Sequence, residues 1–253
     1  MNWNYNFINI IYMISVEVLD KPELSKIKMN CDEVIDKKML KFPMVADCFS
    51  KSSFNIIVGK MGQGKTSLVT NFVKTIFKKC FNKIYVFIPQ NSRKSIENDI
   101  YGRYLPESQL YDNLNVEDLN KVYEELQESS NEEEFSLLII DDFQTQLKDP
   151  EILDILKKII TKMRHLRVSI WLLQQNYQAL DKSMRELVSN LILYNVGKSQ
   201  LTKIFEEVIT IDKKIYNNLI EFCFKDKHDW ICININGDKN IYRMFDKLLI
   251  TEN

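Results

Sequence analysis

The sequence predicts an α/β fold in which a mainly parallel β-sheet lies between two layers of helices and a β-hairpin follows near the C-terminus. Short, continuous apolar runs alternate with segments of helical spacing between about residues 54 and 194. Continuous β-branched runs are typical of strands buried on both faces, and strands that alternate with helices favour a parallel sheet with right-handed crossovers. The chain has 253 residues, of which 45% are hydrophobic. This size and composition suffice for a full apolar core.

The predicted elements follow one another in a regular order. The expected strands cover residues 54–58, 84–88, 136–140, 168–173 and 191–195. Helical spacing fits residues 65–80, 115–128, 150–163 and 181–189, and two further helices are expected at 199–207 and 212–222. The runs DWICININ and IYRMF flank a Gly-Asp-Lys-Asn turn at 237–240, a pattern that predicts a β-hairpin completing the sheet edge.

Charge and cysteine content exclude several classes of protein. Lys and Arg total 34 against 35 Asp and Glu, for a net charge of −1. A chain that coats nucleic acid through bulk positive charge is therefore excluded, and any such contact must use local patches. The five cysteines include no CxxC pair, so free thiols are expected rather than a zinc ribbon or a disulfide framework.

The N-terminal segment is apolar but does not have the pattern of a targeting signal. Its first sixteen residues contain four asparagines and no Lys or Arg before the apolar run. A membrane-spanning helix needs about 18 consecutive apolar residues without charge, and no segment of the sequence is that long. We therefore expect a soluble intracellular protein without a membrane span. Met1 and Met13 both remain candidates for the true start.

The segment GKMGQGKT, directly after the first predicted strand, matches the phosphate-loop pattern G-x-x-x-x-G-K-[ST] and opens a predicted helix. Its glycines let successive N–H groups converge on phosphate oxygens, and the helix N-terminus adds positive potential. Lys65 is expected to reach the β- and γ-phosphates and Thr66 to hold Mg²⁺. The predicted nucleotide-binding residues are Gly59, Lys60, Met61, Gly62, Gln63, Gly64, Lys65 and Thr66.

Polar residues end two other predicted strands. LLIIDD places Asp141 and Asp142 at the carboxyl end of an apolar strand, and WLLQQNY places Gln175 after another. Ligands of open α/β sheets bind outside these strand ends, so the three side chains should face the phosphate loop. We expect Asp141 to hold Mg²⁺ through water, Asp142 to activate the attacking water, and Gln175 to contact the γ-phosphate or that water.

The ordered set GKMGQGKT, LLIIDD, WLLQQNY and MRELVSNLILY resembles the FtsK–HerA superfamily of ring ATPases. It is most similar to the poxvirus-type genome-packaging ATPases of large DNA viruses and virophages, over about residues 50–245. The resemblance implies a RecA-like (ASCE) P-loop NTPase fold, with residues 1–50 as an N-terminal extension and 51–253 as the ATPase domain. The chain departs from bacterial members, which usually carry Glu where Asp142 stands, and it has no large extra domain.

The same resemblance implies a function and a setting. The expected protein is an ATPase that uses ATP and Mg²⁺ to move double-stranded DNA into a capsid, as a homo-oligomeric ring with ATP between subunits. Its partners would include capsid-vertex or membrane-associated viral proteins, and its location would be the host cytoplasm, in virus factories, or the virion. Ring size, the DNA-contacting loops and the recruiting partner stay open.

A ring ATPase also needs an arginine that reaches the neighbour's γ-phosphate. Arg185, in the segment before the last core strand, is the first candidate, and Arg164 and Arg167 are the others. Basic residues form two clusters that could contact the phosphates of a DNA backbone. These are Lys157, Lys158, Lys162, Arg164 and Arg167, and the pair Arg93 and Lys94 after the second strand.

Two other functions are weighed against this one. A small nucleoside or nucleotide kinase has a similar length and phosphate loop, but it would need an arginine-rich lid late in the chain, and RHLR at 164–167 lies too early. A non-catalytic scaffold that binds nucleotide would not need both carboxylates and the glutamine. A GTPase is excluded because no late N-K-x-D motif is present.

Overall fold

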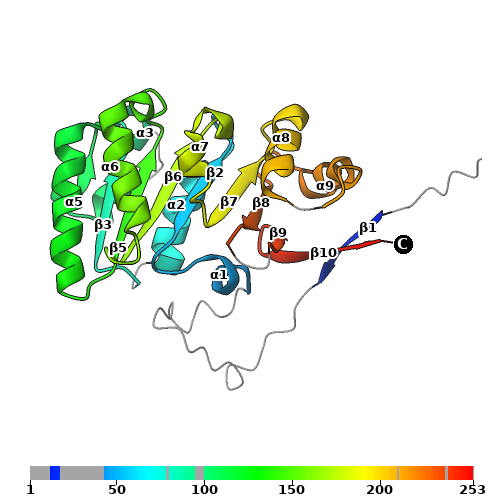
Figure 1. Cartoon of the computed structure of the whole chain (residues 1–253), viewed down its shortest axis with the longest axis horizontal. Helices are drawn as coiled ribbons and strands as arrows, with labels where there is room; N and C mark the ends of the chain where they lie inside the picture. Colours follow the sequence, from blue (N-terminus) through cyan, green and yellow to red (C-terminus); the bar gives the residue numbers. More distant parts are fainter. Residues whose placement is uncertain are drawn as a thin grey trace, which may run out of the picture.

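The computed structural model describes residues 12–17, 43–77, 80–94, 100–209, 211–236 and 239–252. Its centre is a ten-stranded sheet in the order β1-β10-β9-β8-β7-β2-β6-β5-β3-β4 (Figure 1). The strands from β7 to β4 are parallel, and β8, β9, β10 and β1 add to the β7 edge as antiparallel strands. The expected mainly parallel sheet and the antiparallel β8–β9 pair are confirmed, although Gly237 and Asp238 of the expected turn lie outside the described residues.

The core strands lie close to their predicted positions. They are β2 (Phe54–Val58), β3 (Lys83–Phe87), β5 (Ser136–Asp141), β6 (Val168–Gln174) and β7 (Asn190–Tyr194). β6 lies between β2, which leads into the phosphate loop, and β5, which ends in the acidic pair. All these strands are parallel, so their carboxyl ends meet at one edge of the sheet.

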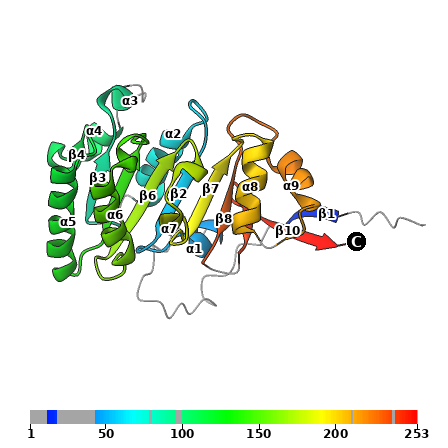
Figure 2. The ribbon, with the colours of Figure 1, turned by 45° about the horizontal axis from the view of Figure 1, so that its top comes forward.

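Helices cover both faces of the sheet and give the three layers expected (Figures 1 and 2). Alternate residues of β2 show the division, since Ile56 faces one apolar cluster and Ile57 faces the other. The first cluster includes side chains of α5 (Val116–Asn131), α6 (Pro150–Thr161), α8 (Lys198–Val208) and α9 (Ile215–Cys223). The second cluster includes side chains of α1 (Pro43–Cys48), α2 (Lys65–Phe72) and the π-helical turn η3 (Val73–Phe77).

Trp171 is one of two tryptophans in the second cluster and is only 1% exposed. Its ring lies 5.0 Å from Phe49, 5.8 Å from Phe72 and 5.5 Å from Phe77, between ring centroids. These tilted and edge-on contacts are favourable aromatic geometries. Trp171 therefore belongs to the core of the fold.

Two predicted helices differ in length from the expectation. The helix expected over 65–80 is α-helical to Phe72 and π-helical from there to Phe77. The helix expected over 181–189 is the single turn α7 (Lys182–Arg185). Asp181 caps this turn, and the N–H of Ser189 already bonds to the carbonyl of Phe54 at 2.8 Å. The chain thus joins the sheet too early for a longer helix.

Several smaller elements were not predicted. They are the edge strands β1 (Tyr12–Glu17) and β4 (Leu110–Tyr111), the strand β10 (Asp246–Glu252) next to β1, the short helices α1, α3 (Gln90–Lys94) and α4 (Ile100–Tyr104), and the 3-10 turns η4 (Glu107–Gln109), η5 (Gln146–Lys148) and η6 (Tyr177–Ala179). β9 (Ile241–Arg243) and β10 are joined by a turn at Met244, and β8 spans Trp230–Asn234. β1 pairs along its whole length with β10, at the end of the sheet farthest from β4.

The part of the chain before residue 51 also reaches the core. Met44 and Val45 of α1 are fully buried in the second cluster. Tyr242 donates a hydrogen bond to the carboxylate of Asp47, and Asn234 donates to the Asp47 carbonyl at 2.5 Å. The division of the chain at residue 50 stays a prediction, while α1 packs as part of the same core as the sheet. Within the described residues, no helix has the length and apolar character needed to cross a bilayer.

Candidate nucleotide-binding site

The phosphate loop follows β2 directly and ends where α2 begins at Lys65. Gly62 and Gly64 have φ values of 73° and 99°, a left-handed backbone that favours glycine. A β-carbon on Gly59 would lie only 3.0 Å from Cδ2 of Tyr194, so the loop also needs glycine there for space. The three glycines therefore serve backbone geometry and close packing, as the motif predicts.

Gln63 holds the loop in shape from within. It is 7% exposed, its Oε1 accepts a hydrogen bond from the N–H of Lys60, and its Nε2 donates to the carbonyl of Asn195 at 2.9 Å. Tyr194 donates its hydroxyl to the carbonyl of Gly64 at 3.2 Å, and Nδ1 of His228 lies 2.9 Å from the carbonyl of Gln63. The loop is thus tied to the end of β7 and to the segment before β8.

Lys65 lies inside the curl of this loop. Its Nζ donates to the carbonyl of Gly59 at 2.7 Å and to that of Lys60 at 3.2 Å. Burial lowers the pKa of the Lys65 ammonium, and the nearby carboxylates of Asp141 and Asp142 oppose this effect. The ammonium is the expected partner of anionic phosphate oxygens at this place.

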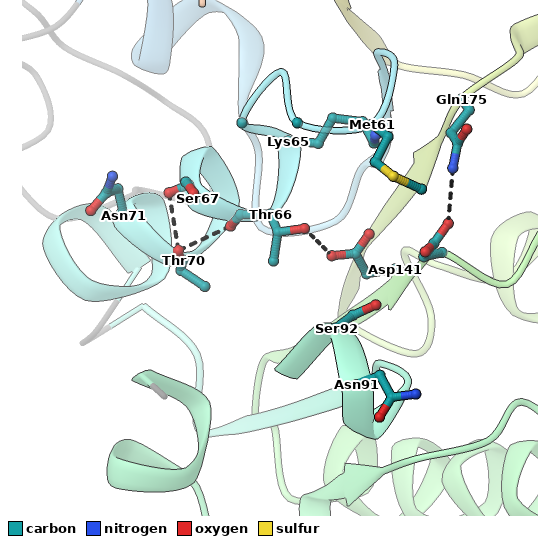
Figure 3. Close-up of a pocket in the computed structure, with 13 residues that line it drawn as sticks. Met61, Lys65, Thr66, Ser67, Thr70, Asn71, Asn91, Ser92, Asp141 and Gln175 are labelled. Carbon is teal, nitrogen blue, oxygen red and sulfur yellow. Dashed lines mark hydrogen bonds between the residues drawn. The ribbon is translucent and has the colours of Figure 1, made fainter. Parts of the chain in front are cut away.

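Thr66 and Asp141 meet where the metal ion is expected. The Thr66 hydroxyl donates to Oδ2 of Asp141 at 2.5 Å (Figure 3). Asp141 is 2% exposed, and burial raises the pKa of its carboxyl to about 6, against the opposing effects of the Thr66 hydrogen bond and the Lys65 charge. A divalent cation would offset this cost of burial, and a hydroxyl with a carboxylate is an oxygen set that suits Mg²⁺. The residues therefore fit the metal role predicted for them.

Asp142 and Gln175 form a second polar pair beside the first. Nε2 of Gln175 donates to Oδ1 of Asp142 at 3.2 Å, across the gap between the ends of β5 and β6 (Figure 3). Asp142 is exposed and has a φ of 63°. A non-glycine residue in this left-handed region carries strain of about 1 kcal/mol or more and often lies in a functional site. The strain directs the second carboxylate away from the core, toward solvent.

These side chains share one cavity of about 690 Å³. Met61, Gly62, Gly64, Lys65, Thr66, Asp141, Asp142 and Gln175 line it, and so do residues that the sequence did not single out as ligands: Ser67, Thr70, Asn71, Asn91 and Ser92. Asn91 and Ser92 lie on α3, across the cavity from α2 (Figure 3). Their only sequence signal was their place after a core strand, which is where ligands of such sheets are held.

Arg185 is not part of this cavity. Its guanidinium forms an ion pair with Glu207 and lies 5.3 Å above the ring of Tyr177. The start of α8, at Lys198, lies beside the phosphate loop. Glu207 is near the other end of this helix, about 14 Å away along its axis. Arg185 is therefore remote from the γ-phosphate position of its own chain, and its expected role in a neighbour's site stays a prediction.

The other candidate cations that follow α6 or belong to it do not line the cavity either. Arg164 is exposed, while Arg167 donates to the carbonyl of Glu133 at 2.8 Å, and both precede β6 at the edge opposite the cavity. Lys157 pairs with Asp181 at 3.1 Å and Lys158 with Asp154 at 2.7 Å, so these two charges are largely balanced within the chain.

Comparison with known proteins agrees with this geometry. The B204 DNA-packaging ATPase of Sulfolobus turreted icosahedral virus is 16% identical, with a TM-score of 0.54 over 76% of this chain and 96% of that chain. The B204 genome-packaging NTPase of Sulfolobus turreted icosahedral virus 2, in complex with AMPPCP, is also 16% identical, with a TM-score of 0.57 and the same coverage. The cytoplasmic domain of the type VII secretion ATPase EccC from Thermomonospora curvata is 13% identical, with a TM-score of 0.52 over 76% of this chain and 25% of that chain. At these identities the likeness concerns the fold.

The fold and the site together define the class of the protein, which is that of the P-loop ATPases. No curated protein sequence matches the chain significantly. The model of one family, described as the poxvirus A32 protein, matches residues 44–238. The chain belongs to this poxvirus A32 family, as its ordered motifs indicated.

Proposed function

We propose that the protein is an ATP-driven double-stranded DNA translocase that packages a viral genome into its capsid. The observation that carries the proposal is the convergence of Lys65, the Thr66–Asp141 pair and the Asp142–Gln175 pair on one cavity. The A32 family and the fold shared with the B204 packaging ATPases support the link to genome packaging.

Each residue has a distinct task in ATP hydrolysis. Lys65 leaves its loop carbonyls and binds the β- and γ-phosphates, while the N–H groups of the loop and the start of α2 bind the remaining oxygens. Thr66 and Asp141 hold Mg²⁺, which, when bound, neutralises charge that develops on the phosphates. Asp142 accepts the proton of the attacking water. Gln175, already hydrogen-bonded to Asp142, orients the carboxylate and the water toward each other.

The site lacks one part that such reactions use. Among the described residues no arginine lines the cavity. In related reactions, an arginine that contacts the γ-phosphate typically raises the rate of hydrolysis by about 10³–10⁵. We propose that a neighbouring subunit in a ring supplies it, from Arg185, Arg164 or Arg167. Capsid-vertex or membrane-associated viral proteins as partners, and the host cytoplasm or the virion as location, belong to the same proposal.

The test is ATP turnover with and without long duplex DNA, with Lys65→Ala as the inactive reference. We expect DNA to stimulate the wild-type protein several-fold and to leave Lys65→Ala inactive. Phosphoryl transfer to an added nucleoside, without stimulation by DNA, would identify a kinase and contradict the proposal.

A further inference from the structure

The segment Lys225–Asp229, between α9 and β8, lies against the phosphate loop although about 160 residues separate them in the sequence. β8 is antiparallel to β7, and Trp230 pairs with Tyr194, so the segment reaches the edge of the sheet where the nucleotide site lies. His228 bonds to the carbonyl of Gln63 through Nδ1 at 2.9 Å. The same nitrogen would lie 3.5 Å from a β-carbon on Gly64. A second part of the chain thus forms a wall beside the loop.

Hydrogen bonds and an ion pair stabilise this wall. Asp229 is 6% exposed, and its Oδ2 accepts hydrogen bonds from the N–H groups of Lys225 and Asp226 at 2.9 and 3.0 Å. The same oxygen pairs with the guanidinium of Arg243, on β9, at 3.1 Å. The buried carboxylate closes the turn and fastens it to the C-terminal hairpin. The backbone that carries residues 227 and 228 is therefore held against the phosphate loop.

Lys227 projects from this wall toward the tip of the loop. Its Nζ would lie 3.8 Å from a β-carbon on Gly62, and the side chain is exposed and makes no ion pair with any described residue. Lys225, two residues earlier, points elsewhere, since its Nζ lies 5.5 Å above the ring of Phe222. The two lysines thus share a segment and a charge, but only Lys227 faces the phosphate loop.

We propose that Lys227 is a second cation of the nucleotide site, which binds a nucleoside triphosphate together with Lys65, and that His228 positions the loop for it. The proposal rests on the proposed binding of ATP at this loop. A triphosphate brings several negative charges to a place where Lys65 is the one cation that lines the described cavity. Lys227 itself is outside the lining of this cavity, so its ammonium adds attraction from beside the tip of the loop rather than from within the cavity.

The charge is tested by binding of Mg²⁺–ATP to purified full-length protein, measured by calorimetry at low and at physiological salt. Lys227→Gln is expected to raise Kd by about tenfold at low salt and less at higher salt, because exposed charges are screened. Lys227→Arg should retain most of the affinity. Lys225→Gln is the matched control and should bind as wild type, because its side chain points away from the loop.

The positioning role is tested by a rescue. His228→Ala removes the donor to Gln63, whereas the amide nitrogen of His228→Asn can take the place of Nδ1. We expect His228→Ala to raise KM for ATP by about fivefold with a small change in kcat, and His228→Asn to restore KM. His165→Ala, at the exposed second histidine, is the control and should behave as wild type.

The outcomes separate this inference from the proposed function. Equal affinities of the Lys227→Gln and Lys225→Gln proteins, with unchanged thermal unfolding, would overturn the role of Lys227. Failure of Asn to rescue the His228 variant would overturn the positioning role. If ATP binding depends on Lys227 while duplex DNA does not stimulate turnover, the inference stands and the translocase proposal fails.

Discussion

Burial sets the behaviour of the charged residues at the site. Asp141 lies almost fully out of water, and desolvation raises its pKa to about 6, while desolvation lowers the pKa of Lys65. Both shifts disfavour charge before nucleotide arrives. The free protein therefore carries a free-energy cost for burying these charged groups, which a charged ligand would offset.

Removal of the buried carboxylate should stabilise the free protein. The raised pKa of Asp141 means that the folded state favours the protonated form, so the penalty is absent below about pH 4, grows between about pH 4 and 6, and is complete above that. We expect Asp141→Asn to increase the free energy of unfolding by about 1–3 kcal/mol at pH 7.5, and by much less at pH 4.5. Urea unfolding at the two pH values measures this. An equal effect at both would contradict the assignment.

The two acidic residues should differ in function. We expect Asp142→Asn to keep Mg²⁺–ATP binding but to slow hydrolysis by about 10²–10⁴, because the amide cannot take the proton of the attacking water. Asp141→Asn should instead weaken the binding that depends on Mg²⁺. Calorimetry combined with single-turnover hydrolysis separates the two effects. Equal loss of binding in both variants would make Asp142 part of the metal site.

At the scale of elements, a buried network of polar side chains joins β2, β7 and α1. Nδ2 of Asn190 donates to Oδ1 of Asn55 at 2.8 Å and to the carbonyl of Cys48. Asn55 in turn donates to the hydroxyl of Ser53 at 2.9 Å. Both asparagines are at most 1% exposed. The network fixes the register of the phosphate-loop strand against its neighbour.

Loss of this network should cost stability without touching the nucleotide site. We expect Asn190→Ala to lower the free energy of unfolding by about 2–4 kcal/mol, because two buried acceptors lose their donor. Asn131→Ala, at the exposed end of α5, should change it by less than about 0.5 kcal/mol. Chemical denaturation of both variants makes the comparison. A small effect at Asn190 would mean that water replaces the lost donor.

The elements that the sequence predicted well are those with a strong local signal. β2 was predicted to the residue because FNIIV is apolar throughout and ends at the glycine of a known motif. β10 was missed because DKLLITE is half polar, as expected of a strand near a sheet edge. The motif also predicted loop residues that line the cavity, whereas it gave no indication of His228 and Lys227, since only the antiparallel return of β8 brings them to the loop.

At the scale of the whole molecule, no arginine of the described residues lines the cavity, and in the proposed ring turnover would therefore depend on assembly. We expect activity per subunit to rise with protein concentration, and to rise further on DNA, which gathers subunits. A mixture of Arg185→Ala and Lys65→Ala proteins should recover part of the activity that each lacks, because an adjacent pair can form one intact site. The same mixture made with Arg164→Ala or Arg167→Ala identifies the arginine. Flat activity over a hundredfold dilution, with no recovery, would indicate a self-sufficient monomer.

The pairing of β1 with β10 also bears on how the chain is made. Tyr12 lies opposite Glu252, so the first described strand finds its partner only after the whole segment between these two residues has been synthesised. Contacts between such distant residues form slowly, because a long loop must close first. The parallel centre, from β2 to β7, needs no residue beyond 194 for its own strand pairing. We therefore expect the nucleotide edge to take shape before β10 has been synthesised, and β1 to join the sheet only after that.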